Sequence, residues 1–324
     1  MSGQILNKHQ SIKADTPLSA HHYIAEAETA LAVNGRTFHW ARRFLGARQG
    51  QNAATLYSLC RLLDDMADGD IKNGPKRLYQ IEQDLSLMRQ NNSHKATDPA
   101  FAAYQPFLMN NDISLTALSH LIKGLLLDQE KVALHSQDEL VRYGYYVAGT
   151  VGLMMCPLIG CRDDKATAFA VDMGIAMQLT NIARDVLEDA EMGRRYLPAA
   201  WVDGLSAHDI AKAARTNDKV KIVLIRQAVE RTISLAESYY QSGFAGLHYL
   251  PYRPRLAIAI AAKAYRQIGI KLLANQVNWH EGRTITSTTS KAIQSVAALP
   301  KCISPSQPAI HKAALHQPLD KLFS

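Results

Sequence analysis

Two groups of carboxylate and amide side chains stand far apart in this chain, each spaced so that a helix would gather it on one face. They are Asp64, Asp65 and Asp68 in CRLLDDMADGD, and Asn181, Asp185 and Asp189 in QLTNIARDVLED. Residues four positions apart stack on the same side of an α-helix. The spacing therefore predicts two rows of oxygen atoms, one on each of two helices.

Such rows are unfavourable unless something binds them. Carboxylates four residues apart repel each other by about 0.2–0.5 kcal/mol per pair on a solvated helix, and aspartate is a poor helix former. Oxygen ligands suit a hard cation such as Mg²⁺, which takes one or two carboxylates and completes its shell with water and phosphate oxygens. Two facing rows therefore predict a diphosphate held between the rows.

A solvated helix end is the alternative for either group taken alone. However, Arg61 lies three residues before Asp64, and Arg184 is adjacent to Asp185. Two acidic groups, each with its own arginine inside an apolar helical stretch, are hard to explain as an exposed surface. The pair therefore indicates a site that binds metal and an anion.

The composition favours a single all-α domain. The 324 residues include no Pro-, Gly- or Ser-rich linker between the ends, and apolar residues recur at intervals of three and four. The net charge of +7 fits an anionic substrate, an anionic membrane surface or nucleic acid. Because no run of five or more Lys and Arg occurs, we expect no nucleic-acid partner.

Several features favour a cytoplasmic protein. The four cysteines form no CxxC pair or disulfide-like framework, which is typical of a reducing compartment. The N-terminal segment lacks the apolar core of a signal peptide. The longest apolar helical stretch, 256–273, is interrupted by Lys263, Arg266 and Lys271, so we expect no membrane span.

Apolar periodicity predicts helices over most of the chain. The expected ranges are about 36–46, 51–68, 114–128, 137–160, 165–189, 206–215, 218–247 and 253–278. We expect residues 1–16 to form a flexible tail, 17–283 the helical domain, and 284–324 a partly disordered C-terminal segment.

Glycines and prolines add two local predictions. Gly149 and Gly152 lie three residues apart within an expected helix, which indicates close approach of another helix or of a substrate chain. The loop at 190–198, EMGRRYLP with its flanking residues, follows the second row directly. We expect this loop to act as a lid.

These motifs resemble those of the squalene/phytoene synthase family, the head-to-head branch of the trans-isoprenyl diphosphate synthases. LYSLCRLLDDMADGD is similar to the first family signature, and QLTNIARDVLEDAEMGRRYLP is similar to the second almost residue for residue. YGYYVAGTVGLMM resembles a third block. RTFHW corresponds to the [ST]-x-[ST]-F segment, with Gly35 in place of its first hydroxyl residue. The resemblance runs from about residue 36 to residue 283.

The resemblance implies an all-helical isoprenoid-synthase bundle around a deep apolar cavity. Two allylic prenyl diphosphates would bind there with three Mg²⁺ ions, for which Mn²⁺ can substitute. The residues that would bind metal are Asp64, Asp65, Asp68, Asn181, Asp185 and Asp189. The residues that would bind substrate are Thr37, Arg61, Tyr143, Gln178, Arg184, Arg195, Tyr196, Tyr265 and Arg283. The catalytic set would be Asp64, Asp68, Asp185, Asp189, Tyr57 and Phe38.

The implied chemistry passes through carbocations. Loss of diphosphate, assisted by metal and arginine, leaves an allylic cation that the double bond of the second substrate attacks. The cyclopropylcarbinyl diphosphate so formed ionises, rearranges and loses a proton. Water would quench each cation, so the site must close. The rings of Phe38, Tyr57, Tyr143 and Tyr146 could stabilise cations by about 0.5–2 kcal/mol each, with core packing as the alternative role.

The GRRYLP extension most resembles the bacterial phytoene branch of the family. That resemblance implies condensation of two geranylgeranyl diphosphates to 15-cis-phytoene, the first step of carotenoid biosynthesis, with no NADPH. Squalene or dehydrosqualene synthesis from farnesyl diphosphate is the alternative. Apolar substrates and product favour peripheral contact with a membrane, and the oligomeric state stays open.

Other classes fit the motifs less well. A head-to-tail prenyl synthase would carry a second DDxxD, and terpene cyclases lack the RDVxED-GRxYLP extension. A basic helical nucleic-acid-binding or scaffold protein would account for the net charge but not for the aspartate rows.

Overall fold

Helices form nearly all the regular structure in the computed structural model, which describes residues 40–129, 132–281 and 310–323. The all-α prediction is confirmed. The α-helices are α3 (Ala47–Ala67), α4 (Gly74–Gln90), α5 (Pro99–Ala102), α6 (Gln105–Asn110), α7 (Leu115–Leu127), α8 (Gln137–Gly144), α9 (Thr150–Leu158), α10 (Ala166–Arg184), α11 (Val186–Glu191), α12 (Ala207–Thr216), α13 (Lys219–Ala245), α14 (Tyr252–Ala274) and α16 (Asp320–Phe323). The shorter elements are the π-helix η1 (Tyr145–Gly149) and the 3₁₀ helices η2 (Ala199–Trp201), η3 (Gly246–Tyr249) and η4 (Ala313–Leu319).

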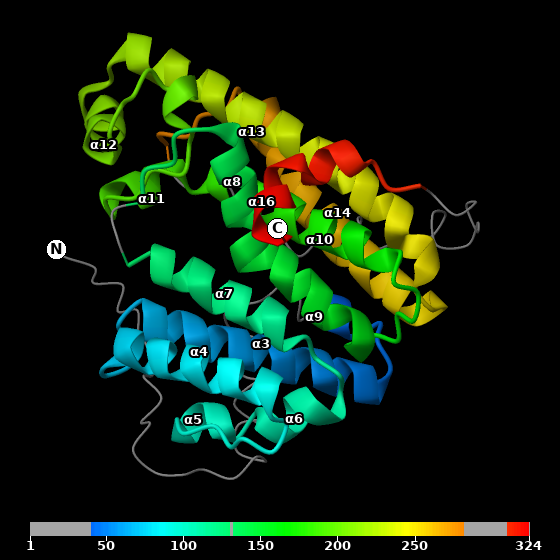
Figure 1. The fold of residues 1–324 in the computed structure, drawn as a ribbon. Helices are drawn as coiled ribbons and strands as arrows, with labels where there is room; N and C mark the ends of the chain where they lie inside the picture. Colours follow the sequence, from blue (N-terminus) through cyan, green and yellow to red (C-terminus); the bar gives the residue numbers. More distant parts are fainter. Residues whose placement is uncertain (1–39, 130–131, 282–309, 324) are drawn as a thin grey trace, which may run out of the picture.

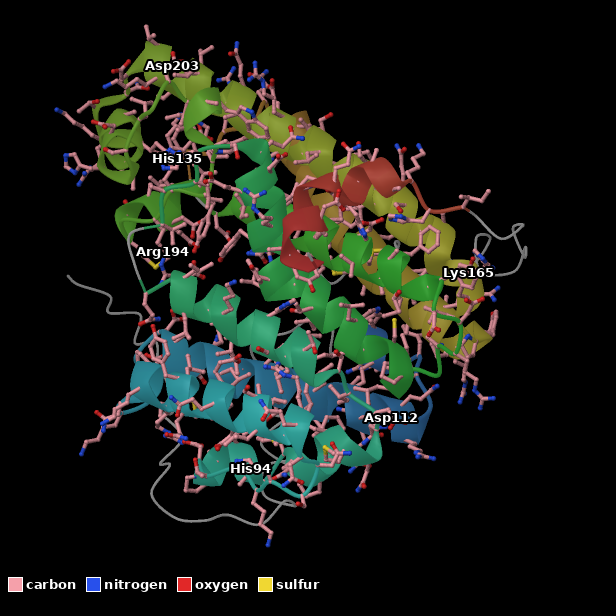
Figure 2. The ribbon with its side chains drawn as sticks, in the orientation of Figure 1. His94, Asp112, His135, Lys165, Arg194 and Asp203 are labelled. Carbon is pink, nitrogen blue, oxygen red and sulfur yellow. The ribbon has the colours of Figure 1, made fainter. Side chains whose placement is uncertain are left out.

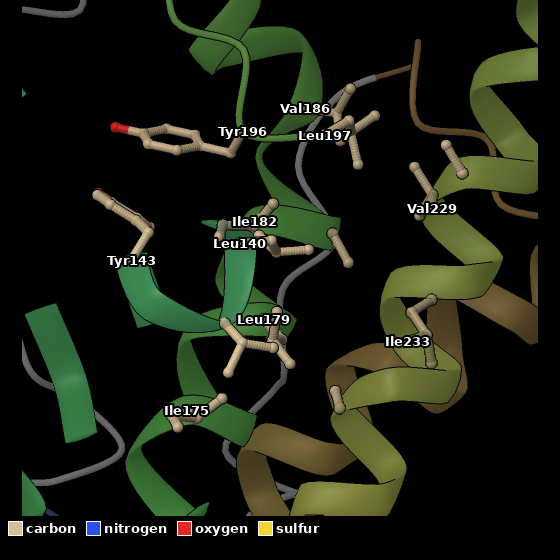
Figure 3. Close-up of a cluster of buried hydrophobic side chains, with 14 of the residues drawn as sticks. Leu140, Tyr143, Ile175, Leu179, Ile182, Val186, Tyr196, Leu197, Val229 and Ile233 are labelled. Carbon is tan, nitrogen blue, oxygen red and sulfur yellow. The ribbon is translucent and has the colours of Figure 1, made fainter. Parts of the chain in front are cut away.

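The helices are arranged in layers (Figure 1). α3 and α4 lie together on one side, α13 and α14 lie on the other, and α7, α9 and α10 pass between them. Two buried apolar clusters follow this division, one around α10 and α13 and one around α3, α4 and α7. Figure 3 shows part of the first cluster, in which Leu179 and Ile182 of α10 face Val229 and Ile233 of α13. The two helices that carry the aspartate rows thus belong to different clusters.

Two glycines allow η1 and α9 to pack closely against α10. A Cβ atom on Gly152 would lie 2.2 Å from the carbonyl oxygen of Ala170, and one on Gly174 would lie 2.3 Å from the carbonyl oxygen of Ala148. No side chain fits at either distance. Gly152 therefore meets a neighbouring helix, and it also lines an apolar cavity, so neither of the two alternatives that the sequence left open is excluded.

The observed helices differ from the predicted ranges in several places. Of the predicted helix 36–46, residues 40–42 are helical and 43–44 form a turn, while 36–39 lie outside the described residues. The predicted helix 165–189 is interrupted at Asp185, whose φ of −104° and ψ of 16° separate α10 from α11. The predicted helix 137–160 contains the π-helix η1, which joins α8 to α9. Helix α4 and the short helices α5 and α6 fall outside the predicted ranges, although Asp98-Pro99 predicts a helix start and α5 begins there.

Residues 310–323, which the sequence places in a partly disordered C-terminal segment, are folded onto the bundle. The hydroxyl of Tyr239 on α13 donates a hydrogen bond to the carbonyl of Leu315 (2.7 Å), and Arg142 on α8 donates one to the carbonyl of Pro318 (3.2 Å). The rest of that segment and the N-terminal tail lie outside the described residues. The domain boundaries therefore stay a prediction.

In the described part of the chain, no helix combines the length and the apolarity that crossing a bilayer requires.

Candidate active site

An apolar cavity of about 350 Å³ lies between α3, α9, α10, η3 and α14. Tyr57, Gln178, Asn181 and Tyr265 line it at one end, while Phe169 and Leu247 line it elsewhere. Asn181 and Phe169 are twelve residues apart on α10, which corresponds to about 18 Å at 1.5 Å per residue. The cavity therefore extends from polar residues near the second row deep into an apolar interior.

The first aspartate row lies on the last two turns of α3. Arg61 donates a hydrogen bond to Asp64 (2.9 Å) and forms an ion pair with Asp65. Burial raises the pKa of Asp64 to about 6; the charge of Arg61 opposes this shift, and that of Asp68 adds to it. Burial also raises the pKa of Asp65. Negative charge at Asp64 and Asp65 is thus costly, and a bound cation would offset that cost.

The second row runs across the junction of α10 and α11. Although the helix is interrupted there, the amide of Asp185 bonds the carbonyl of Asn181 (2.9 Å) and the amide of Asp189 bonds that of Asp185 (2.8 Å). Arg184 donates two hydrogen bonds to the Asp185 carboxylate, at 2.7 and 2.5 Å. Burial, followed by the charge of Asp185, raises the pKa of Asp189 to about 7.

One atom of the second row has no partner. The Oδ1 atom of Asn181 is buried and accepts no hydrogen bond from the described residues, while its Nδ2 atom donates to Gln178 (3.3 Å). A buried oxygen without a donor is costly, and a cation would satisfy it. Together with the raised carboxylate pKa values, this oxygen fits the hard-cation site that the sequence predicts.

The loop after α11 connects the two rows. Arg194 forms an ion pair with Asp68 at 3.2 Å, which joins the loop to the end of α3. The positive charge of Arg194 also favours the ionised form of Asp189, but burial has the larger effect, so the pKa of Asp189 is raised overall. In Figure 2, Arg194 lies on one side of the molecule, and Lys165, next to the cavity residue Ala166, lies on the other.

Arg195 contacts backbone carbonyls of the fold. Its guanidinium is buried and donates hydrogen bonds to the carbonyls of Leu134 (2.7 Å) and Leu197 (2.6 Å). The backbone at Arg195 pairs with Val132 and Leu134, which holds the loop against the segment before α8. Both of these bonds come from Nη1 of Arg195, so part of its guanidinium serves the fold, and its predicted contact with diphosphate stays a prediction. Arg194, its neighbour, contacts a carboxylate of the first row.

A further carboxylate, Asp128, lies beside both rows and was missed in the sequence. The hydroxyls of Tyr143 and Tyr196 donate hydrogen bonds to it at 2.8 and 3.2 Å. Burial raises its pKa to about 6, and the negative charge of Asp68 adds to the shift. The negative charge of Asp128 in turn adds to the raised pKa values of Asp64 and Asp189, so Asp128 interacts electrostatically with both rows. It lies alone at the end of an apolar helix, without a partner at helical spacing, so no sequence pattern could single it out.

The two tyrosines that hold Asp128 were predicted as substrate-binding residues. Their rings pack with centroids 4.7 Å apart, and Figure 3 shows both side chains extending in the same direction, away from the aliphatic cluster. Neither ring lines the apolar cavity. Thr37, Phe38 and Arg283 lie outside the described residues, so their predicted roles are not tested.

A second group of possible metal ligands lies elsewhere on α10. Asp172 accepts hydrogen bonds from His311 (2.7 Å), His316 (2.8 Å) and Ser242 (2.5 Å). Asp172 is fully buried and does not line the cavity. This group is therefore separate from the aspartate rows.

Two rows of carboxylate and amide oxygens near the polar end of an apolar cavity, in an all-helical bundle, are the arrangement that the family resemblance predicts. The chain belongs to the squalene/phytoene synthase family, whose model matches residues 31–290. The enzyme is a prenyltransferase of this family.

Individual relatives agree with this assignment. The chain is 38% identical over 278 residues to a 15-cis-phytoene synthase of Enterobacter agglomerans. This alignment covers 83% of this chain and 92% of that protein. The chain is 35% identical over 283 residues to a 15-cis-phytoene synthase of Pantoea ananas, which covers 84% and 89%. Among solved structures, a dehydrosqualene synthase in complex with ligand superposes with a TM-score of 0.72 at 26% identity, over 87% of this chain and 96% of that chain.

Proposed function

We propose that the protein is a 15-cis-phytoene synthase that joins two geranylgeranyl diphosphates head to head and releases diphosphate. The observation that carries the proposal is the apolar cavity that begins at the paired aspartate rows. The relatives named 15-cis-phytoene synthase match this chain at 33–38% identity over most of its length, which supports the same product.

The two rows and their arginines would hold the diphosphate groups. Asp64, Asp65 and Asp68 would bind Mg²⁺ from one side, and Asn181, Asp185 and Asp189 from the other. Bound there, Mg²⁺ or Mn²⁺ neutralises the charge that develops on the departing diphosphate. Arg61, Arg184 and Arg194 each contact a carboxylate of the rows. Each would also donate hydrogen bonds to oxygens of a diphosphate bound there.

The cavity wall would protect the cationic stages from water. Tyr57 and Tyr265 line its polar end, where the first cation would form. The ring of Tyr57, a neutral phenol whose pKa burial raises to about 12, would present its face to the cation. The loop that carries Arg194 and Tyr196 contacts Asp68 and Asp128, and it would cover the diphosphate end. The last cation would be discharged by proton loss, so no NADPH is required.

Cavity depth favours the longer substrate over the alternative farnesyl diphosphate. The distance of about 18 Å from Asn181 to Phe169 along α10 is comparable with an extended C20 chain and exceeds an extended C15 chain. A shorter chain would leave part of the apolar wall uncovered, at about 0.8 kcal/mol for each methylene that is not buried. We also propose that the enzyme works in the cytoplasm and contacts the membrane surface peripherally, because substrate and product are both apolar.

Product identification tests the proposal. Purified protein with geranylgeranyl diphosphate and Mg²⁺, without nicotinamide, should release inorganic diphosphate and form a C40 hydrocarbon with a central conjugated triene. Chelation of divalent metal should stop the reaction, and Mn²⁺ should restore part of it. If C30 product predominates at equal concentrations of the two substrates, or if product requires NADPH, the proposal is wrong.

A further inference from the structure

Phe169 occupies a key position in the apolar part of the cavity. It lies near the start of α10, about 18 Å along the helix from Asn181, and its side chain lines the cavity. A substrate chain whose diphosphate is bound at the aspartate rows would meet Phe169 with its last isoprene unit. The position of this ring therefore bears on the length of chain that the cavity accepts.

Three neighbours hold the ring of Phe169. A Cβ atom on Gly246 would lie 2.2 Å from the Cβ atom of Phe169, so only glycine lets η3 approach this closely. The ring of Tyr249 packs at a centroid distance of 5.8 Å. The ring of His311 meets Phe169 edge to face, with centroids 5.3 Å apart and an interplanar angle of 84°. His311 belongs to the C-terminal segment and does not itself line the cavity.

His311 is in turn fixed by the core of the bundle. Its Nε2 atom bonds the Oδ2 atom of Asp172, one turn along α10 from Phe169, at 2.7 Å. His316 bonds the other oxygen of the same carboxylate at 2.8 Å, and Ser242 of α13 donates to Oδ2 at 2.5 Å. Asp172 is fully buried, so this contact attaches the C-terminal segment to α10 at a defined position.

We propose that the C-terminal segment helps to set substrate chain length, with His311 as a positioning residue whose ring holds Phe169 against the end of the prenyl chain. The inference rests on the proposed function, because it assumes that the cavity holds the hydrocarbon part of a prenyl diphosphate. Asp172 acts one step further back by keeping His311 in place. His316 shares the carboxylate, but its described ring contact is with His311 and not with Phe169.

Variants of His311 separate its two contacts. His311→Phe keeps an aromatic ring beside Phe169 and loses the bond to Asp172, whereas His311→Gln keeps a donor for Asp172 and loses the ring. His316→Gln is the matched control on the same carboxylate, and Phe169→Ala removes the ring that is being positioned. For each protein, kcat/KM is measured with farnesyl, geranylgeranyl and geranylfarnesyl diphosphate, and folding is checked by thermal melting.

We expect the chain-length preference to change in the variants that lose the ring of Phe169 or of His311. Phe169→Ala should raise the ratio of kcat/KM for the C25 over the C20 substrate by about tenfold or more, since a single methylene in an apolar pocket already gives about tenfold discrimination. His311→Gln should shift the ratio in the same direction by a smaller factor. His311→Phe should shift the ratio less than His311→Gln does, because the ring beside Phe169 remains although its bond to Asp172 is lost. His316→Gln should keep the wild-type ratio.

Two outcomes would overturn the inference. One is a folded His311→Gln or Phe169→Ala protein with the wild-type ratio, and the other is an equal shift in His311→Phe and His311→Gln. Both differ from failure of the proposed function, in which the wild-type protein forms no C40 product from geranylgeranyl diphosphate.

Discussion

Replacing Asp189 by Asn should stabilise the metal-free protein while abolishing its activity. The pKa of Asp189 rises from 3.8 to about 7 on folding, mainly because the carboxylate is buried. The folded state therefore holds the proton more tightly than the unfolded state, and the ionised carboxylate destabilises the fold above pH 7. Three pKa units correspond to about 4 kcal/mol, which residual solvent contact reduces to about 2–4 kcal/mol.

Asn removes that cost without changing the shape of the side chain. Above pH 8 the free energy of unfolding of Asp189→Asn should exceed that of the wild type by about 2–4 kcal/mol, or about 3–6 °C in Tm for a chain of this length. The gain should decrease as the pH falls through 7, because the wild-type carboxylate then becomes protonated. At pH 5 less than half of it should remain.

Thermal melts at pH 5 and pH 8.5 in a chelating buffer measure the stability gain of Asp189→Asn at each pH. Glu188→Gln is the control, since Glu188 is the exposed acidic neighbour on the same short helix. Mg²⁺ with inorganic diphosphate should raise the Tm of the wild type and have less effect on Asp189→Asn. Two results would refute the inference that the ionised Asp189 carboxylate destabilises the metal-free protein. One is a lower Tm for Asp189→Asn than for the wild type at pH 8.5, and the other is a Tm difference that does not depend on pH.

The remaining predictions concern the residues around the rows. Asp64→Asn and Asp185→Asn should each lower turnover by about 100-fold or more with unchanged helical circular dichroism, and retention of a tenth of the activity would contradict their role as ligands. Arg194→Ala should lower activity without loss of stability, whereas Arg195→Ala should lower the free energy of unfolding by about 2 kcal/mol or more in denaturant titrations, because two carbonyls lose their donor. Asp128→Asn should speed proteolytic cleavage within 190–198, because it weakens the bonds from two tyrosines, and an unchanged cleavage rate would argue against that link.

The sequence determined the architecture and most of the candidate site. Apolar periodicity is a local signal, since one face of each helix must be buried, and it located the long helices that became α3, α10, α13 and α14. The aspartate rows were equally readable, because a row of like charges on an apolar helix is explained by few functions other than cation binding. Helix α4 was not predicted, although Asn73, Pro75 and a periodic apolar face were present. Its sequence carries none of the candidate site residues.

Other features depend on contacts between segments far apart in the chain. Neighbouring arginines such as Arg194 and Arg195 look alike in sequence, yet the docking of their loop sends one guanidinium to Asp68 and the other to buried carbonyls. Asp128 became part of the site only because Tyr143 and Tyr196, from two different segments, meet at its carboxylate.

The same holds for the C-terminal segment. Its weak periodicity suggested partial disorder, because the few residues that anchor it are spaced irregularly. The carboxylate that receives them, Asp172, lies 139 residues before His311 and 144 before His316. Local sequence thus determined which helices form and where the carboxylate and amide oxygens of the two rows stand, since these depend on spacing within one helix. Only the tertiary structure decided which arginine faces the carboxylates and which residues surround the far part of the cavity, since those contacts form only when distant segments pack together.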